Sequence, residues 1–201
     1  MTILIENSEL GKVWLSLLNE LVTMGEKVGD EILELLSVSV SFGPVTDQDS
    51  ILSEFADDNN IQEMRKVFFT SEQNAFGHNY KENIVGPLGR NDFQDIVELL
   101  RENPACKRAL ISIIGNKKGK VPCINVVHFL LREEGLVIVY FARGQDIFNK
   151  FYADAISISD MAQIVAKQLG VNVFRISGLI SSAHIYLNDL PKIKDILARA
   201  K

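Results

Sequence analysis

The chain is poor in cysteine, in basic charge and in long apolar segments, and each shortage excludes a class of protein. Two cysteines are too few for a disulfide scaffold, and no cysteine or histidine spacing resembles a zinc site, so we expect no bound metal. A net charge of -5 does not suit a polyphosphate-binding surface, so nucleic acid is not an expected partner. No apolar run reaches the length of a membrane span and no signal sequence is evident, so we expect a soluble, cytoplasmic protein without membrane contact.

The remaining composition is that of a well-buried globular unit. The 201 residues are 47% hydrophobic, which is enough for one core, and we therefore expect a single domain over residues 1–201. Apolar residues recur with helical spacing at 8–24, 91–103 and 155–169, and a last helix is expected at 191–200. Asn91 and Asp154 stand just before two of these helices, where the ordinary role of such residues is an N-cap.

Strand periodicity governs much of the remaining chain. Residues 124–132 and 136–143 are two long apolar segments joined by a tight turn at Glu134-Gly135, which predicts an antiparallel pair at the centre of a sheet. Further strands are expected at 34–42, 109–115 and 173–180. Helices and strands in irregular order, without a βαβ repeat, favour the α+β class with one large mixed sheet flanked by helices.

Several side chains have both a chemical and a structural interpretation. Cys123 follows a proline at the start of a strand, and Arg143, beyond the turn, could lie near it, lower the pKa of its thiol and bind an anion. The alternatives are a small buried cysteine and an ordinary arginine at a strand end. Asp154 is equally well explained as an N-cap, and His184 and Tyr186 as packing residues. None of these residues decides the function alone.

Taken together, the spacing of these residues resembles the thymidylate synthase and deoxycytidylate hydroxymethylase family. The resemblance runs from residue 122 to residue 188 and continues more loosely upstream. The matching motifs are Pro122-Cys123, Arg143-x-x-Asp146, Met161-Ala162-Gln163, His184-Ile185-Tyr186-Leu187-Asn188 and, upstream, Glu34, Tyr80 and the pair Lys107-Arg108. The resemblance implies a thymidylate synthase-like fold and a homodimer formed through the sheet.

The resemblance also assigns roles to these residues. Cys123 would be the nucleophile that adds to C6 of a pyrimidine nucleoside monophosphate, because a thiolate is a strong nucleophile near neutral pH. Asp146 would bind the pterin of a reduced folate, 5,10-methylenetetrahydrofolate. Arg143 would contact the 5'-phosphate, and Lys107 and Arg108 would contact the phosphate bound by the other subunit of the dimer. His184 and Tyr186 would contact the sugar, and Tyr80 and Glu34 would handle protons and ordered water.

Asp154 stands where thymidylate synthases have an asparagine that reads uracil. A carboxylate only accepts hydrogen bonds, so it suits a cytosine that offers N4-H and a protonated N3. The same pairing makes the ring a better electrophile for Cys123. We therefore expect hydroxymethylation at C5 of dCMP or CMP, in which water traps the exocyclic methylene.

Two other interpretations remain open. One is methylation of dUMP by a compact thymidylate synthase, against which Asp154 speaks. The other is a nucleotide-binding protein that has the fold but not the reaction, which is favoured by the missing C-terminal lid and by the changes at Ile124 and Gly144. The run 150–153 also departs from the family's motif before the base-reading residue. The sequence also ends at Lys201, so we expect the usual C-terminal extension of the family to be lacking.

Overall fold

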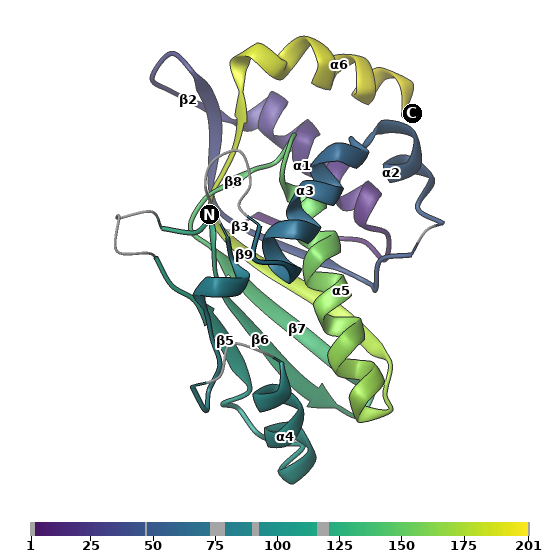
Figure 1. Ribbon diagram of the computed structural model, residues 1–201. Coiled ribbons are helices and arrows are strands. Elements are labelled where there is room, and N and C mark those ends of the chain that lie inside the picture. The colour runs from purple at the N-terminus through teal and green to yellow at the C-terminus, as the bar shows by residue number, and fades with distance from the viewer. Residues whose placement is uncertain (1–2, 47, 73–78, 90–92, 116–120, 201) are drawn as a thin grey trace.

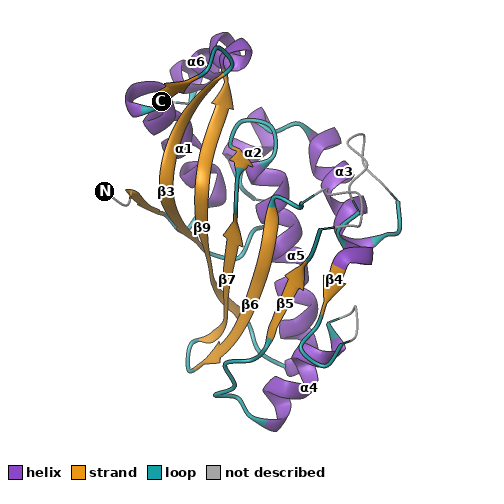
Figure 2. Cartoon of the chain, turned by 90° about the vertical axis from the view of Figure 1, so that its left-hand side faces the viewer, coloured by secondary structure: helices purple, strands orange, loops and turns teal. Residues whose placement is uncertain are grey.

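The fold is built on a mixed sheet with helices on one face (Figures 1 and 2). It is seen in a computed structural model, which describes residues 3–46, 48–72, 79–89, 93–115 and 121–200. The strands of this described part are β1 (Ile3–Glu6), β2 (Glu26–Val28), β3 (Ile32–Phe42), β4 (Ile84–Val85), β5 (Leu110–Ile113), β6 (Ile124–Arg132), β7 (Gly135–Ala142), β8 (Gln145–Asp146) and β9 (Val173–Tyr186).

The strand order confirms the predicted α+β class. The strands run β1-β3-β9-β7-β6-β5-β4, with β2 beside β3 and β8 beside β9. The β6 and β7 pair is antiparallel, as the turn at Glu134-Gly135 predicts. In contrast, β7 and β9 are parallel, so the chain between them must cross one face of the sheet. A helix makes this crossing and thereby covers the core face.

The helices are α1 (Leu10–Met24), α2 (Ser50–Phe55), α3 (Asp58–Phe69), α4 (Gln94–Glu102), α5 (Phe151–Leu169) and α6 (Leu190–Arg199), with 3-10 turns η1 (Lys81–Asn83) and η2 (Leu187–Asp189). The crossover helix is α5, drawn in green across the sheet in Figure 1. None of the helices in the described ranges is long and apolar enough to span a membrane.

Several boundaries differ from the prediction, and two of these differences concern the candidate site. The helix α5 begins at Phe151 and its N-cap is Lys150, so the N-cap interpretation of Asp154 is wrong. Asp154 instead lies in the first turn, where the helix dipole favours a carboxylate. The strand β9 continues to Tyr186 because it pairs with β3 as far as Ile32. The predicted N-cap Asn91 lies outside the described residues.

One face of the sheet has no helix over it in the described structure. In Figure 2 the strands lie in front and the helices behind them. Val139 of β7 and Leu179 of β9 are 39% and 43% exposed, while Tyr140 and Ile180 beside them are buried against the helices. The two faces are therefore chemically distinct: one holds the core, and the other presents apolar side chains to the outside.

A tryptophan fixes the segment that carries the candidate site. The Trp14 side chain of α1 is buried, and its Nε1 donates a hydrogen bond to the carbonyl oxygen of Ile147 at 2.8 Å. Its ring also packs at 4.9 Å from the ring of Tyr152 in the first turn of α5. These contacts tie the end of β8 and the start of α5 to the core, so side chains from both have fixed positions.

Candidate functional site

Cys123 and Arg143 are neighbours, as the sequence predicts. The amide of Arg143 donates to the carbonyl oxygen of Cys123 at 2.9 Å. The guanidinium group donates from Nε to Pro122 O at 3.0 Å and from one terminal nitrogen to Val121 O at 2.8 Å. A guanidinium has five N–H groups, so donors remain for an anion. Arg143 thus braces the backbone before Cys123 and brings a positive charge to the thiol.

Tyr80 reaches the same cysteine from a distant part of the sequence. Its hydroxyl accepts a hydrogen bond from the Cys123 amide at 3.2 Å. The ring is buried and packs edge-on against Phe68 of α3 at 4.9 Å between centroids. Burial, followed by the charge of Asp154, raises the pKa of Tyr80 well above its ordinary range, so the phenol remains protonated at neutral pH.

The thiol of Cys123 differs from the sequence expectation. Burial and then the negative charge of Asp154 raise its pKa, and these effects outweigh the lowering by Arg143, Tyr80 and Lys150. The prediction that Arg143 lowers the thiol pKa is correct for its own contribution but wrong for the net shift. In the free protein the thiol is therefore mainly protonated near neutral pH.

Asp154 is the most strongly buried acid near Cys123, with 2% of its surface exposed. Its Oδ2 accepts a hydrogen bond from Gln145 Nε2 at 3.0 Å, whereas its Oδ1 has no hydrogen-bond partner among the described residues. Burial raises the pKa of this carboxyl to about 7, and the Gln145 hydrogen bond and the Lys150 charge oppose that shift. An unpaired buried carboxylate oxygen is costly, so this atom is a natural contact for a bound ligand.

Two further buried polar atoms near Asp154 were not singled out from the sequence. Gln145 Oε1 and the Tyr140 hydroxyl have no hydrogen-bond partner in the described part of the chain. Tyr140 fits only because residue 178 is glycine: a Cβ there would meet the Tyr140 ring at 2.2 Å. Gln145 lies between the two motif residues of Arg143-x-x-Asp146, and this position is its only sequence signal.

Asp146, the predicted folate ligand, is largely used within the protein. Its Oδ1 accepts from the amides of Phe148 and Asn149 at 3.1 and 3.0 Å, and its Oδ2 accepts from Asn149 Nδ2 at 3.0 Å. A carboxylate offers about four acceptor positions, so capacity for one more donor remains, on Oδ2. The donor set thus fits a single N–H group of a pterin.

His184, Tyr186 and Glu34 gather where β3, β8 and β9 meet. Glu34 pairs with His184 across β3 and β9, and Asp146 pairs with His184 from the other side. Glu34 accepts a hydrogen bond from the Ser182 hydroxyl. The rings of His184 and Tyr186 are 5.7 Å apart and line a hollow of about 570 Å³ together with residues 28–32. Burial raises the pKa of Tyr186, and the charges of Asp146 and Cys123 raise it further.

Lys107 and Arg108 lie away from these residues within one chain. Both are exposed and precede β5, whose first residue Leu110 pairs with His128 of β6. Cys123 stands at the other end of β6, which puts His128 roughly 15 Å or more along the strand from it. The structure therefore brings together all the predicted site residues except this pair.

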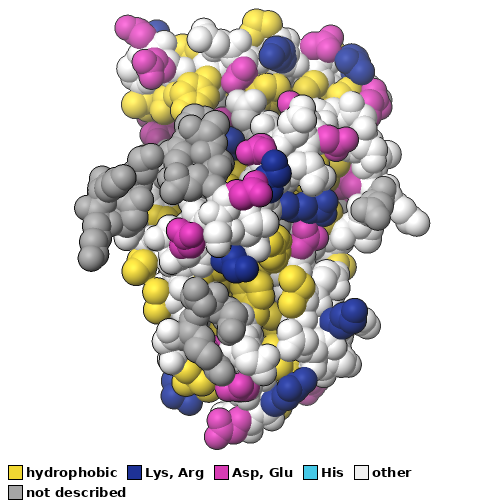
Figure 3. All heavy atoms as spheres, viewed as in Figure 1, with side chains coloured by type: hydrophobic (Ala, Val, Ile, Leu, Met, Phe, Trp, Pro, Cys, Tyr) yellow, Lys and Arg dark blue, Asp and Glu magenta, His cyan; other side chains and the backbone are white. Residues whose placement is uncertain are grey.

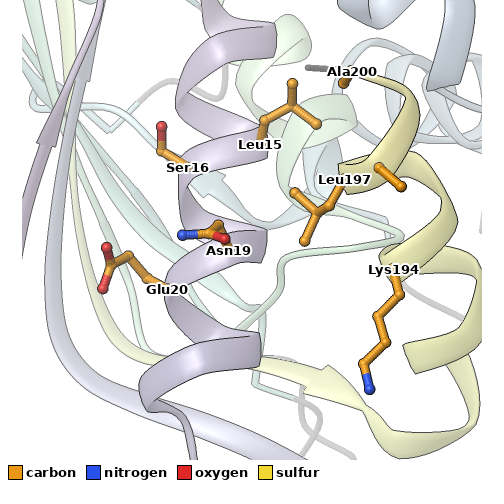
Figure 4. Close-up of a pocket in the computed structure, with 8 residues that line it drawn as sticks. Leu15, Ser16, Asn19, Glu20, Lys194, Leu197 and Ala200 are labelled. Carbon is orange, nitrogen blue, oxygen red and sulfur yellow. The ribbon is translucent and has the colours of Figure 1, made fainter.

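Hollows also occur elsewhere on the protein. One, of about 470 Å³, lies between α1 and α6, where Leu15 and Leu197 point toward each other (Figure 4). No group of three or more possible metal ligands occurs in the residues that the structure describes. On the face shown in Figure 3, basic and acidic side chains are interspersed. Arg65 of α3 and Asp160 of α5 form a salt bridge at 2.8 Å.

The site combines a nucleophile with groups that can form hydrogen bonds to a polar heterocycle. The thiol of Cys123 lies beside a cation and a phenol, and the unpaired oxygen of Asp154 supplies a hydrogen-bonding group that can accept or, when protonated, donate. Lys150, the N-cap of α5, adds a positive charge that acts on both Cys123 and Asp154. The sequence marks Lys150 only as part of a run, 150–153, that departs from the resembled family.

Comparison with known proteins gives one family. The sequence model described as thymidylate synthase matches residues 17–201. A Methanosarcina barkeri protein named "Putative thymidylate synthase" is 25% identical over 200 residues, covering 94% of this chain and 91% of that protein. A Methanothermobacter marburgensis protein of the same name is 24% identical over 141 residues, covering 68% of this chain and 63% of that protein. A Listeria monocytogenes protein named "Thymidylate synthase" is 24% identical over 144 residues, covering 64% of this chain but 46% of its own length.

Proposed function

Because this chain belongs to the thymidylate synthase family, a family of one-carbon transferases, we propose that it hydroxymethylates C5 of a cytidine monophosphate, dCMP or CMP. The one-carbon donor is 5,10-methylenetetrahydrofolate and the second reactant is water. The overall reaction converts the nucleotide, the folate and one water molecule into a 5-hydroxymethylcytidine monophosphate and tetrahydrofolate.

The observation that carries this proposal is the state of Asp154. Its Oδ1 is buried and unpaired among the described residues, and no side-chain amide stands at this position to offer a donor to O4 of uracil. An ionised carboxylate accepts hydrogen bonds from the N4 amine and a protonated N3 of cytosine. The free energy of leaving Oδ1 unpaired in the free protein is then recovered when a cytosine binds.

The other residues of the site suit addition of a thiol to a pyrimidine. Cys123 Sγ forms a bond to C6, and the electron pair moves to C5, which becomes the carbon nucleophile. Arg143 provides a positive charge beside the thiol and retains donors for a 5'-phosphate. Tyr80, which stays protonated, and Glu34 handle protons and ordered water. C5 then bonds to the one-carbon unit of the folate, loses its proton and expels tetrahydrofolate, which leaves an exocyclic methylene. Water adds to this carbon, and the bond between Sγ and C6 breaks.

The folate supplies the carbon at the oxidation level of formaldehyde. Asp146 has an acceptor position left on Oδ2, which fits one N–H group of a pterin. The hollow beside His184 and Tyr186 adjoins this carboxylate through the pairing of β8 with β9. In the proposed arrangement His184 and Tyr186 bind the sugar hydroxyl, so the nucleotide and the folate meet between Cys123 and Asp146.

The proposal includes a homodimer. The sheet face without helices presents Val139 and Leu179, which offer apolar area to a second copy of this chain. Lys107 and Arg108 lie far from Cys123 along β6, so a role in binding the phosphate requires that they come from the other copy. The dimer thereby completes the phosphate site with two further cations.

A second candidate is methylation of dUMP, the activity that the names of the relatives suggest. The specific observation in its favour is the raised pKa of Asp154, about 7. A protonated carboxyl can donate to O4 of uracil, as an asparagine amide does. Binding of nucleotide without turnover is the third possibility, and the raised pKa of the Cys123 thiol favours it.

The test is product analysis by mass spectrometry after incubation with 5,10-methylenetetrahydrofolate and, separately, dCMP, CMP or dUMP. We expect a gain of one hydroxymethyl group on a cytidylate and no product from the Cys123→Ala variant, which serves as the matched control. A methylated uridylate as the main product would establish the second candidate instead. Nucleotide binding without any product would leave the non-catalytic alternative.

A further inference from the structure

Among the described residues, Asp154 is held through one of its two carboxylate oxygens, and the partner is a residue to which the family resemblance gives no role. Gln145 is 1% exposed and donates from Nε2 to Asp154 Oδ2 at 3.0 Å. The amide lies on β8, which pairs with β9, while Asp154 lies in the first turn of α5. The contact therefore joins two elements that Trp14 also anchors to the core, and neither side chain is free to turn away.

We propose that Gln145 is a positioning residue: it reserves Oδ2 of Asp154, so that Oδ1 alone contacts the ligand and alone carries the exchangeable proton. The physical reason is that an N–H donor aimed at Oδ2 disfavours a proton on the same oxygen. When the carboxyl group is protonated, the proton thus resides on Oδ1. When it is ionised, Oδ1 is an acceptor.

Oδ1 of Asp154 can then bind a ligand in two ways, as a hydrogen-bond acceptor or as a donor. With Oδ1 ionised, the site accepts a hydrogen bond and suits the exocyclic amine of an aminopyrimidine. With Oδ1 protonated, the site donates a hydrogen bond and suits the carbonyl oxygen of an oxopyrimidine. In both complexes the site and the base together hold one proton, on Oδ1 with an oxopyrimidine and on N3 with an aminopyrimidine. Binding of either therefore takes up a proton once Asp154 has ionised, a consequence that rests on the proposed function.

A titration seen near neutral pH can be attributed to Asp154, because the tyrosines and the thiol that face it do not titrate in that range. Besides Gln145, it is faced by Tyr80 and Tyr140, by Cys123, and by the charges of Lys150 and Asp146. Burial raises the pKa of both tyrosines and of the thiol, so these three groups stay protonated through neutral pH. The Gln145 hydrogen bond lowers the pKa of Asp154 by favouring its charged form, so removal of that bond has a defined direction.

The experiment follows the carboxyl carbon of Asp154 by ¹³C NMR between pH 5 and pH 9 without nucleotide, with the signal assigned by its loss in Asp154→Asn. Gln145→Leu and Gln145→Met remove the donor at similar volume, and the second variant serves if the first does not fold. We expect the titration midpoint to rise by about one unit or more in both, since a hydrogen bond to a charged group is worth about one to two pKa units. Gln163→Leu, the same change at an exposed position of α5, is the control and leaves the midpoint unchanged.

Binding of dCMP and dUMP to the same variants is then measured over the same pH range. In the wild type, the Kd of either nucleotide should rise as the pH rises above the Asp154 midpoint, because each complex holds one proton that the ionised free site has lost, and in the Gln145 variants this rise begins at higher pH. An unchanged midpoint in both Gln145 variants overturns the inference, even if dCMP binds. A shifted midpoint with no binding of either nucleotide supports the role of Gln145 and rejects the proposed function.

Discussion

Burial sets the chemistry of Asp154 and Cys123 at the scale of single residues. Both are acids held away from water, and for both desolvation is the largest influence on the pKa. The charge of Asp154 further disfavours the thiolate of Cys123. A ligand that neutralises Asp154, such as a cytosine protonated at N3, removes this repulsion. Substrate binding would thus favour the thiolate at the point where it is needed.

This coupling predicts how fast Cys123 is alkylated. The rate of iodoacetamide modification, followed at Cys123 by peptide mass spectrometry, should rise with pH to a midpoint above 9.0, the ordinary value for a thiol. Asp154→Asn removes a negative charge and should lower the midpoint, whereas Lys150→Met removes a positive charge and should raise it. Equal midpoints in all three proteins would mean that the charges do not act on the thiol.

The raised pKa of Asp154 also predicts a pH-dependent stability. Between its ordinary value of 3.8 and about 7, the folded state binds a proton that the unfolded state has lost. This contribution to stability is fully present below 3.8 and is lost as the pH rises through about 7. Since one pKa unit is about 1.36 kcal/mol, the wild type should lose ~2 kcal/mol relative to Asp154→Asn between pH 5.5 and pH 8.

Urea unfolding at these two pH values measures the difference. Asp49 is the matched control, because it is also buried but accepts hydrogen bonds from the amides of Gly11 and Leu52. Asp49→Asn loses part of that pairing and should destabilise the protein by about 1 kcal/mol at both pH values. An Asp154→Asn protein whose stability follows the same pH profile as the wild type would contradict the assigned pKa.

At the scale of elements, the sequence predicts what local periodicity and turn chemistry determine. The β6 and β7 hairpin is predicted because Gly135 can adopt the positive φ, +135°, that the turn requires. The neighbourhood of Cys123 and Arg143 then follows from the register of that hairpin. The motif residues of the site are likewise recognisable from their spacing, although their roles remain predictions.

The features that the sequence does not predict depend on pairing and packing between segments far apart in the sequence. The strand β9 extends to Tyr186 because β3 pairs with it over its whole end, and serines at 181 and 182 hide the alternation in the sequence. The contact between Gln145 and Asp154 depends on how β8 is packed against the start of α5, which no local pattern reports. The N-cap interpretation of Asp154 failed for the same reason.

Gly178 of β9 leaves space for the buried ring of Tyr140, which lies near Asp154. A Cβ at position 178 would lie 2.2 Å from Tyr140 Cζ, and the buried ring has no space to move. Gly178→Ala should therefore destabilise the protein by about 1 to 3 kcal/mol. At Gly144 a Cβ would be 3.8 Å from its nearest neighbour, so Gly144→Ala should change the midpoint of thermal unfolding little. Equal effects would contradict this packing.

At the scale of the whole molecule, the helices divide the sheet into a filled face and an open one. The proposed dimer predicts a solution mass of twice the 22.5 kDa chain by light scattering. Leu179→Glu places a charge on the open face and should give monomers. Ile164→Glu makes the same kind of change at a 39% exposed position of α5 and should leave the dimer intact. A monomeric wild type would remove the basis for a phosphate site shared between subunits.

The whole account depends on the claim that Asp154 selects cytosine, and a competition between substrates tests it most directly. Equal amounts of dCMP and dUMP are incubated in one tube with 5,10-methylenetetrahydrofolate at pH 8, and both products are quantified by mass spectrometry for the wild type and for Asp154→Asn. We predict that the wild type modifies dCMP in preference to dUMP and that Asp154→Asn reverses the preference. The same preference in both proteins, or modification of dUMP alone by the wild type, would contradict the claim.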